Sequence, residues 1–238
     1  MSEWKAKRFW TSAEAVEGEG GYAITLDTKP VKTPAKKALV VPTRRLAAAI
    51  AAEWDAQQEY VDPTTMPFTR TANAALDKVA LQHAEVADML ADYGDSDLLC
   101  YRADQPAELV ARQAEQWDPM LAWASTVLGV TLEPRSGVMH QPQDSAALAR
   151  LRAQVHALTD FELAAFHDLV SLSGSLILAF AAAQDVKTSK AIWDISRLDE
   201  LWQAEQWGAD EDAEAAAAIK QDAFEHAKVV FDLCQPES

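Results

Sequence analysis

Residues 59–69, Glu-Tyr-Val-Asp-Pro-Thr-Thr-Met-Pro-Phe-Thr, separate two parts of the chain that differ in periodicity. Pro63 and Pro67 lack a backbone N–H and threonines favour turns, so no regular helix or strand should run through this stretch. We therefore predict a β-rich N-terminal domain with a connecting helix over residues 1–62 and an α-helical domain over residues 63–238. The predicted fold class is α+β, a small β-rich domain followed by a larger all-helical one.

The N-terminal part, between residues 8 and 41, has the pattern of strands. Tyr22, Ile24 and Leu26 alternate with small or polar residues, and a turn is predicted over residues 27–30. The number of strands does not follow from this pattern.

A connecting helix is predicted to begin at Thr43, whose hydroxyl can accept a hydrogen bond from a first-turn N–H. Leu46, Ile50 and Trp54 recur every four residues and therefore share one helix face. We expect Trp54 to lie in the core with the other two.

Beyond the boundary the pattern is helical, and three breaks are predicted. Gly94 should end one helix in a left-handed conformation, Asp118-Pro119 should divide a long segment into two helices, and the second of these should end at Gly129. Further helical stretches are predicted at residues 148–158, 161–183 and 187–230, the last containing at least two helices.

The most apolar segment, residues 169–183, is shorter than the ~20 apolar residues that a membrane span needs, so a buried core helix is predicted and no membrane insertion. Ser171–Ser175 lies within this helix and lacks the flanking glycines of a nucleophile elbow. We expect these small residues to let two helices approach closely.

The formal net charge is -16, and it is unevenly distributed, because Lys and Arg outnumber Asp and Glu before residue 46 and the acids dominate afterwards. The acidic part of the chain after residue 45 repels phosphate backbones and anionic lipids, which argues against nucleic-acid or membrane partners. A basic or amphiphilic protein surface is a better partner. The alternative is that the acidity only keeps the protein soluble.

Cysteine usage and the N-terminus indicate the compartment. Cys100 and Cys234 form no CxxC motif and no disulfide framework, which suits a reducing environment, and each is expected to be buried. The first ten residues contain no apolar secretory stretch. A cytoplasmic protein is predicted.

Signatures of catalysis and of metal or cofactor binding are scarce. The glycines at positions 18, 20 and 21 come before a strand, so they form a turn and not a phosphate cradle. No two histidines have the spacing of a helical zinc site, and His167 beside Asp168 is expected to be hydrogen-bonded near the core. We predict no catalytic residues, no metal and no cofactor.

The densest acidic cluster contains seven carboxylates and two tryptophans, Trp202 and Trp207. Charged helix faces are usually only solvated, but indoles among carboxylates suit a contact surface, since indoles bury a large area at low entropic cost. Whether both indoles face the core instead stays open. The carboxylates are Asp199, Glu200, Glu205, Asp210, Glu211, Asp212 and Glu214.

Several segments together resemble the mitochondrial and α-proteobacterial assembly chaperones of the F-type ATP synthase α subunit. The resemblance covers nearly the whole chain and rests on the order and spacing of its motifs. They are Gly20–Asp27, Lys32–Pro34, Glu53–Gln58, Met66-Pro67, Asn73–Asp77, Asp97–Arg102, Gln116–Pro119 with Trp123, Ser196–Leu198, and Gln203 with Trp207, Gly208, Glu211 and Ala213.

The resemblance implies a function without chemistry: the protein, expected to be a monomer, would hold unassembled α subunit in soluble form until the β subunit replaces it. It places partner contacts on Glu211, Trp207, Gly208, Glu200 and Gln203. It also implies a bacterial cytoplasmic protein, or a mitochondrial matrix protein if this is a processed organellar form.

Asp210 departs from the family's pattern, which has an apolar residue there. Either this position faces solvent, or the contact surface differs in detail. Two alternatives to the chaperone are an enzyme that uses carboxylates from Glu200 to Glu214 as acid and base, and a general binder of basic peptides.

Overall fold

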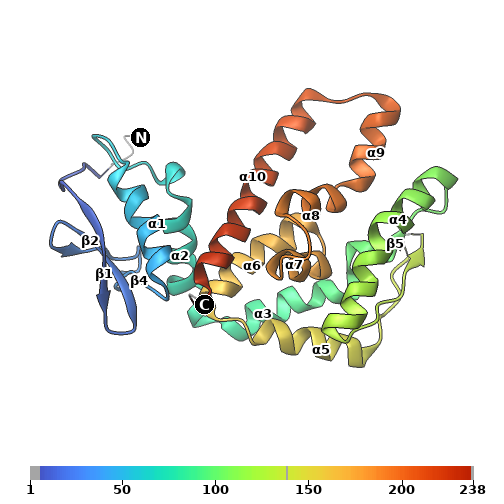
Figure 1. Cartoon of the computed structure of the whole chain (residues 1–238), viewed down its shortest axis with the longest axis horizontal. Helices are drawn as coiled ribbons and strands as arrows, with labels where there is room; N and C mark the ends of the chain where they lie inside the picture. Colours follow the sequence, from blue (N-terminus) through green and yellow to red (C-terminus); the bar gives the residue numbers. More distant parts are fainter. Residues whose placement is uncertain (1–5, 138, 237–238) are drawn as a thin grey trace. The chain divides into compact units, whose positions relative to one another are not determined.

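The computed structural model describes residues 6–137 and 139–236, which form two compact units. The N-terminal unit contains the chain up to His83, together with Thr159–Ala165 and the stretch from Val229 onward. The helical unit contains Ala84–Leu158 and Phe166–Lys228. The α+β class is confirmed, with a small sheet first and helices after it (Figure 1). The boundary at residues 62 and 63 stays a prediction.

The sheet of the N-terminal unit is antiparallel and is organised around β2. β2 pairs with β1 through a tight glycine turn, and it also pairs with β3 and β4. Gly21 has a φ of +143°, and a Cβ there would lie 2.3 Å from the carbonyl oxygen of Val41, so only glycine fits. The strands are β1 Ala13–Gly18, β2 Gly21–Leu26, β3 Lys29–Pro30 and β4 Val40–Val41.

The helices of this unit are α1 Arg44–Asp55 and α2 Pro67–Asp77. The Thr43 hydroxyl caps α1 by accepting a hydrogen bond from the N–H of Leu46 at 3.2 Å, as predicted. Leu46 and Ile50 are buried as predicted. Trp54 is only partly buried, so the prediction that it lies in the core with them is wrong.

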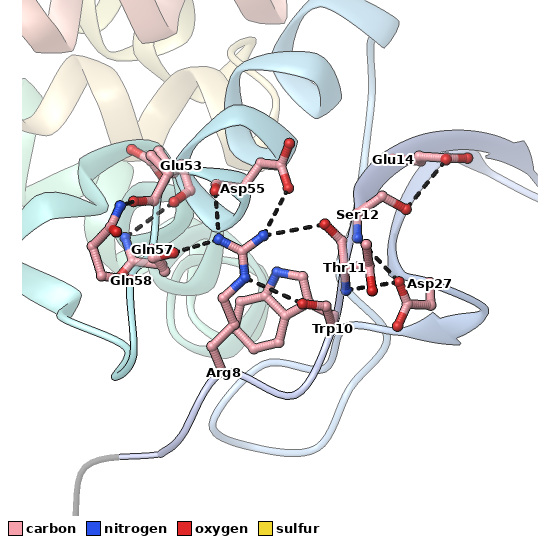
Figure 2. Close-up of polar contacts among 11 residues, drawn as sticks. Arg8, Trp10, Thr11, Ser12, Glu14, Asp27, Glu53, Asp55, Gln57 and Gln58 are labelled. Atoms are coloured by element: carbon pink, nitrogen blue, oxygen red, sulfur yellow. Dashed lines mark hydrogen bonds and ion pairs between the residues drawn. The ribbon is translucent and has the colours of Figure 1, made fainter.

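Arg8 ties the N-terminal segment to the end of α1, as Figure 2 shows. Its guanidinium donates to the carbonyl oxygens of Asp55 (2.8 Å) and Gln57, and to those of Trp10 and Thr11 on its own segment (each 3.2 Å). It therefore satisfies carbonyl groups that the end of a helix leaves unpaired.

The helical unit is built from helices and short 3-10 turns, with one two-residue parallel pair, Tyr101–Arg102 (β5) with Arg135–Ser136 (β6). Its longer elements are α3 His83–Ala91, α4 Ala107–Trp123, α5 Ser145–His156, α6 Asp160–Ser173, α7 Leu176–Ala183, α8 Ser189–Ser196, α9 Leu198–Trp207 and α10 Glu211–Cys234. Three of these helices are shared between the units. The first residue of α3, the first part of α6 and the last part of α10 belong to the N-terminal unit.

Two of the predicted helix breaks are wrong. α4 continues through Pro119, because Trp117 and Met120 on either side are both buried and the Trp117 indole donates to the carbonyl oxygen of Ile195 at 3.0 Å. Gly94 lies inside a 3-10 turn, where a Cβ would come within 2.9 Å of Leu151. Tertiary packing therefore decides both positions. The predicted end at Gly129 is confirmed, with a φ of +68°.

The apolar segment at residues 169–183 is buried as predicted but is not one helix. α6 ends at Ser173, Gly174 takes a φ of +70°, and Ser175 caps α7. The Asp97 carboxylate accepts hydrogen bonds at this junction from the Ser175 hydroxyl (2.8 Å) and the Ile177 N–H (3.0 Å). In the described part of the chain, no helix combines the length and the apolar character that crossing a membrane requires.

Candidate partner-binding surface

The acidic cluster lies on a helical hairpin, which we call the acidic hairpin and define as residues 198–220. It contains α9, the loop 208–210 and the first part of α10, and Figure 1 shows the loop joining the two helices at the top of the view. Gly208 ends α9 with a φ of +94°, a conformation that favours glycine.

The start of α10 is exposed over its whole circumference, since in residues 211–220 only Ala217 is partly covered. Trp207 is 80% exposed, Ile219 71% and Leu201 47%. Helices are usually stabilised by burying one apolar face, and this segment buries none. The acidic hairpin therefore presents apolar side chains among carboxylates to any partner.

The two tryptophans of the cluster differ in their surroundings. Trp207 is exposed at the end of α9, whereas Trp202 is partly buried under the Arg112 guanidinium, which lies 5.3 Å from the centre of its ring. Arg112 also binds Glu205 at 2.8 Å. Of the two indoles, only Trp207 is free for a large contact with another protein.

The five residues predicted to contact a partner are all exposed. Glu200, Gln203 and Trp207 share one face of α9, because they are spaced by three and four residues. Gly208 follows Trp207 in the chain and Glu211 begins α10, so all three lie near the loop that joins the two helices. Glu200 lies near the other end of α9, about 10 Å along the helix from Trp207. Glu200 is bound to Arg197 at 2.8 Å.

Asp210 faces solvent and has a structural role. Its carboxylate accepts a hydrogen bond from the N–H of Ala213 at 2.9 Å and so caps α10. Glu211, Asp212 and Glu214 follow in the first turn, where negative charge is favoured by the helix dipole. An acidic residue at position 210, where the resemblance led us to expect an apolar one, is thus explained by an exposed helix cap.

A groove of about 340 Å³ lies beside the hairpin between α4, α8 and α9. Its two carboxylates are both paired, Glu205 with Arg112 at 2.8 Å and Asp194 with Lys190 at 2.7 Å. The remaining lining is apolar or cationic, as in Leu201 and Lys187, apart from the neutral amide of Gln116. This groove does not offer the free pair of carboxylates that acid–base chemistry needs.

The other side chains with possible chemistry lie apart from the hairpin. His167 is hydrogen-bonded to Asp168 at 2.9 Å, and this contact raises the pKa of His167. Cys100 and Cys234 are buried as predicted, and burial raises the pKa of each thiol to about 12. Among residues 6–137 and 139–236, no group of three or more His, Cys, Asp or Glu side chains could hold a metal ion.

Comparison with known proteins identifies the family of this chain. The sequence model of one family, described as ATP12 chaperone protein, matches residues 7–125, which is half of the chain. The chain belongs to the ATP12 chaperone family. Its function is therefore that of a chaperone in the assembly of the ATP synthase.

Relatives of known structure extend the match across the acidic hairpin. The crystal structure of ATP12 from Paracoccus denitrificans shares 49% identity and a TM-score of 0.95, covering 98% of this chain and 100% of that one. The Atu1473 protein of Agrobacterium tumefaciens shares 43% identity and a TM-score of 0.91, covering 96% of this chain and 86% of that one. The mitochondrial ATP12 protein of Schizosaccharomyces pombe is 28% identical over 219 residues, covering 87% of this chain and 75% of its own length.

The clustering of charge in the sequence predicts the hairpin but not a second feature, which lies in the N-terminal unit. The end of α1 and the start of α2 are joined by Glu53, whose carboxylate accepts hydrogen bonds from the N–H groups of Phe68 (2.6 Å) and Thr69 (2.8 Å). Burial raises the pKa of Glu53. Thr69 of this joint lies in the wall of a cleft in the N-terminal unit.

Proposed function

We propose that this chain binds the unassembled α subunit of the F-type ATP synthase through the acidic hairpin and prevents its aggregation until the β subunit replaces it. The observation that carries this proposal is the 80% exposure of Trp207 at the tip of a helix pair rich in carboxylates. An isolated subunit exposes apolar interface that would otherwise associate wrongly, and reversible covering is sufficient to prevent this.

The chemistry of the hairpin supports a client surface that is apolar with a basic rim. Trp207 supplies the apolar area, while Glu211 and Glu200 supply negative charge on either side. Gln203 adds a hydrogen-bonding group on the same face of α9, and Gly208 permits the turn between α9 and α10, which begins at Glu211. We assign these five residues to the contact.

The proposed contact is of moderate size and needs no turnover of a substrate. A moderate interface allows the β subunit to compete by burying more surface, whereas an obligate interface would trap the complex. The protein would act as a monomer, without a cofactor, in the bacterial cytoplasm, or in the mitochondrial matrix if it is an organellar form.

Size-exclusion chromatography of the chain with purified α subunit tests the proposal. A co-eluting complex is expected, and adding β subunit should release the free chain while α moves to the α–β assembly. Separate peaks for the chain and α subunit at micromolar concentration would contradict it.

Salt dependence separates this function from general binding of basic peptides. A specific complex with buried apolar surface should persist at 0.5 M NaCl, where purely ionic contacts are screened over about 4 to 5 Å. Comparable binding to polylysine and to α subunit, lost for both in salt, would favour the general binder. Turnover of a substrate by the purified chain would favour an enzyme.

A further inference from the structure

The N-terminal unit contains a cleft of about 560 Å³, which we call the α2 cleft. Its walls are the loop at residues 32–36, the end of α1 at Trp54, the loop at residues 61–66 and one face of α2. This volume falls in the range of about 300–1,000 Å³ that is usual for ligand sites. It is several times larger than an inorganic anion needs.

Two residues that line this cleft, Trp54 and Asn73, each carry a buried polar atom that lacks a hydrogen-bond partner. The indole Nε1 of Trp54 and the side-chain Oδ1 of Asn73 are both buried from solvent, and neither has a partner within the described residues. A buried polar group without a partner costs about 1–3 kcal/mol, so each such group calls for an explanation, and a bound ligand is one of them. One atom is a donor and the other belongs to an amide, which can donate and accept.

The charge of the cleft is opposite to that of the chain as a whole. Four cationic side chains line it, and its one acidic side chain, Asp77, is already bound by the Thr33 hydroxyl (2.7 Å) and the N–H of Ala35 (3.0 Å). In a chain of net charge -16 this local excess of positive charge favours an acidic ligand. The cations are Lys32, Lys36, Arg70 and Lys78, of which Arg70 also interacts with Glu53.

The cleft is held open by hydrogen bonds that do not involve a ligand. Gln57 is buried and connects the two ends of the loop between α1 and α2, donating to Thr65 (3.0 Å) and accepting from the N–H of Asp62 (2.7 Å). Glu53 fixes the start of α2 as described above. A preformed site lowers the entropic cost of binding.

We propose that the α2 cleft binds an extended segment of a partner protein in which acidic side chains alternate with apolar ones. The four cations would face its carboxylates, and Met66 and Val61 would contact its apolar side chains. The Asn73 amide and the Trp54 N–H would pair with the segment's backbone after a shift of the atoms that now cover them. This site is on the N-terminal unit, so it is independent of the acidic hairpin and of the α-subunit proposal.

A random hexapeptide library displayed on phage and selected on the full chain tests this proposal without knowledge of the partner. Enriched sequences should contain Asp or Glu next to apolar residues. The best synthetic peptide should shift the Trp54 indole N–H signal in ¹H–¹⁵N NMR spectra. Absence of enrichment, or enrichment of basic sequences, would overturn the proposal.

Matched variants locate the binding. Lys32→Glu with Lys78→Glu should raise the Kd of the peptide at least about tenfold. Arg44→Glu with Lys187→Glu removes two exposed cations outside both the cleft and the acidic hairpin and should leave the Kd within about twofold. Equal effects of the two pairs would show binding by net charge alone and would contradict the assigned site.

Asn73→Leu separates binding from folding. It removes an amide whose oxygen has no partner in the described structure, so the melting temperature should be kept or raised while peptide affinity falls at least about fivefold. Unchanged affinity would contradict the role of Asn73. If millimolar phosphate fully displaced the peptide, the cleft would be a site for small anions instead. If the free chain self-associated through the cleft, the occupant would be a second copy of the chain.

Discussion

The guanidinium of Arg112 on α4 binds the Glu205 carboxylate of α9 at 2.8 Å and covers the ring of Trp202. This contact fixes α9 to the body of the helical unit. The beginning of α10 has no comparable ion pair among the described residues that involves Glu211, Asp212 or Glu214. The acidic hairpin thus has one anchored helix and one whose first turns are available to a partner.

Replacing Arg112 by Gln should weaken the anchoring of α9 only slightly. The pair with Glu205 is partly exposed, so a loss of about 1 kcal/mol or less in unfolding free energy is expected from urea titration. The near-ultraviolet circular dichroism should change, because Trp202 loses the cation above its ring. A loss above about 3 kcal/mol would mean that the contact supports the fold as a whole.

The two tryptophans at positions 207 and 117 should respond very differently to Ala. Trp117 is fully buried and hydrogen-bonded, so Trp117→Ala should cost about 3–5 kcal/mol. Trp207→Ala should change the unfolding free energy by about 0.5 kcal/mol or less, since the side chain is 80% exposed. Urea unfolding of both variants measures this, and a large loss at position 207 would refute its assignment as a free contact residue.

Asp97 should give the helical unit an unusual pH dependence. Burial raises its pKa from 3.8 to about 6, although three hydrogen bonds favour the charged form. The folded chain therefore takes up a proton at a higher pH than the unfolded chain does. Through this group alone, unfolding free energy should rise as pH falls from 6 to 4, by about 2 kcal/mol.

Asp97→Asn isolates that contribution from the other carboxylates. The variant cannot accept all three hydrogen bonds, so it should be less stable at pH 7 by about 1–3 kcal/mol. Its deficit relative to the natural chain should widen between pH 6 and pH 4 in urea titrations. A constant or shrinking deficit would show that the pKa of Asp97 is not raised.

The two thiols should be inert in the native protein. Cys100 and Cys234 are buried, and burial raises the pKa of each to about 12, so thiolate is scarce at pH 8. A disulfide reagent such as dithionitrobenzoate should react with both thiols only after denaturation in guanidinium. Rapid reaction of either thiol in buffer would contradict the packing described around it.

Patterns that depend on neighbours in sequence were predicted well. The cap at Thr43, the alternation from Tyr22 to Leu26 and the helix end at Gly129 are each determined within a few residues. The acidic hairpin was also identified, because carboxylates and indoles cluster in the sequence itself. Its exposure could not be predicted, since it depends on what the rest of the fold leaves uncovered.

Features that depend on distant contacts were missed. Pro119 stays inside α4 because Trp117 binds to Ile195, and the break at Gly174 is stabilised by Asp97, far away in sequence. Trp54 was expected in the core because its spacing follows Leu46 and Ile50, yet it lines the α2 cleft. Helical periodicity identifies a face but not where that face ends.

The central claim is that the acidic hairpin holds unassembled α subunit, and sedimentation velocity of α subunit with the Trp207→Ala, Glu211→Lys double variant tests it most directly. The matched control is Val127→Ala with Glu108→Lys, which changes an exposed apolar and an exposed acidic residue of the same unit outside the hairpin. We expect the double variant to melt within about 2 °C of the natural chain and its complex with α subunit to weaken at least about tenfold, while the control binds normally. Undiminished binding by the double variant would contradict the account.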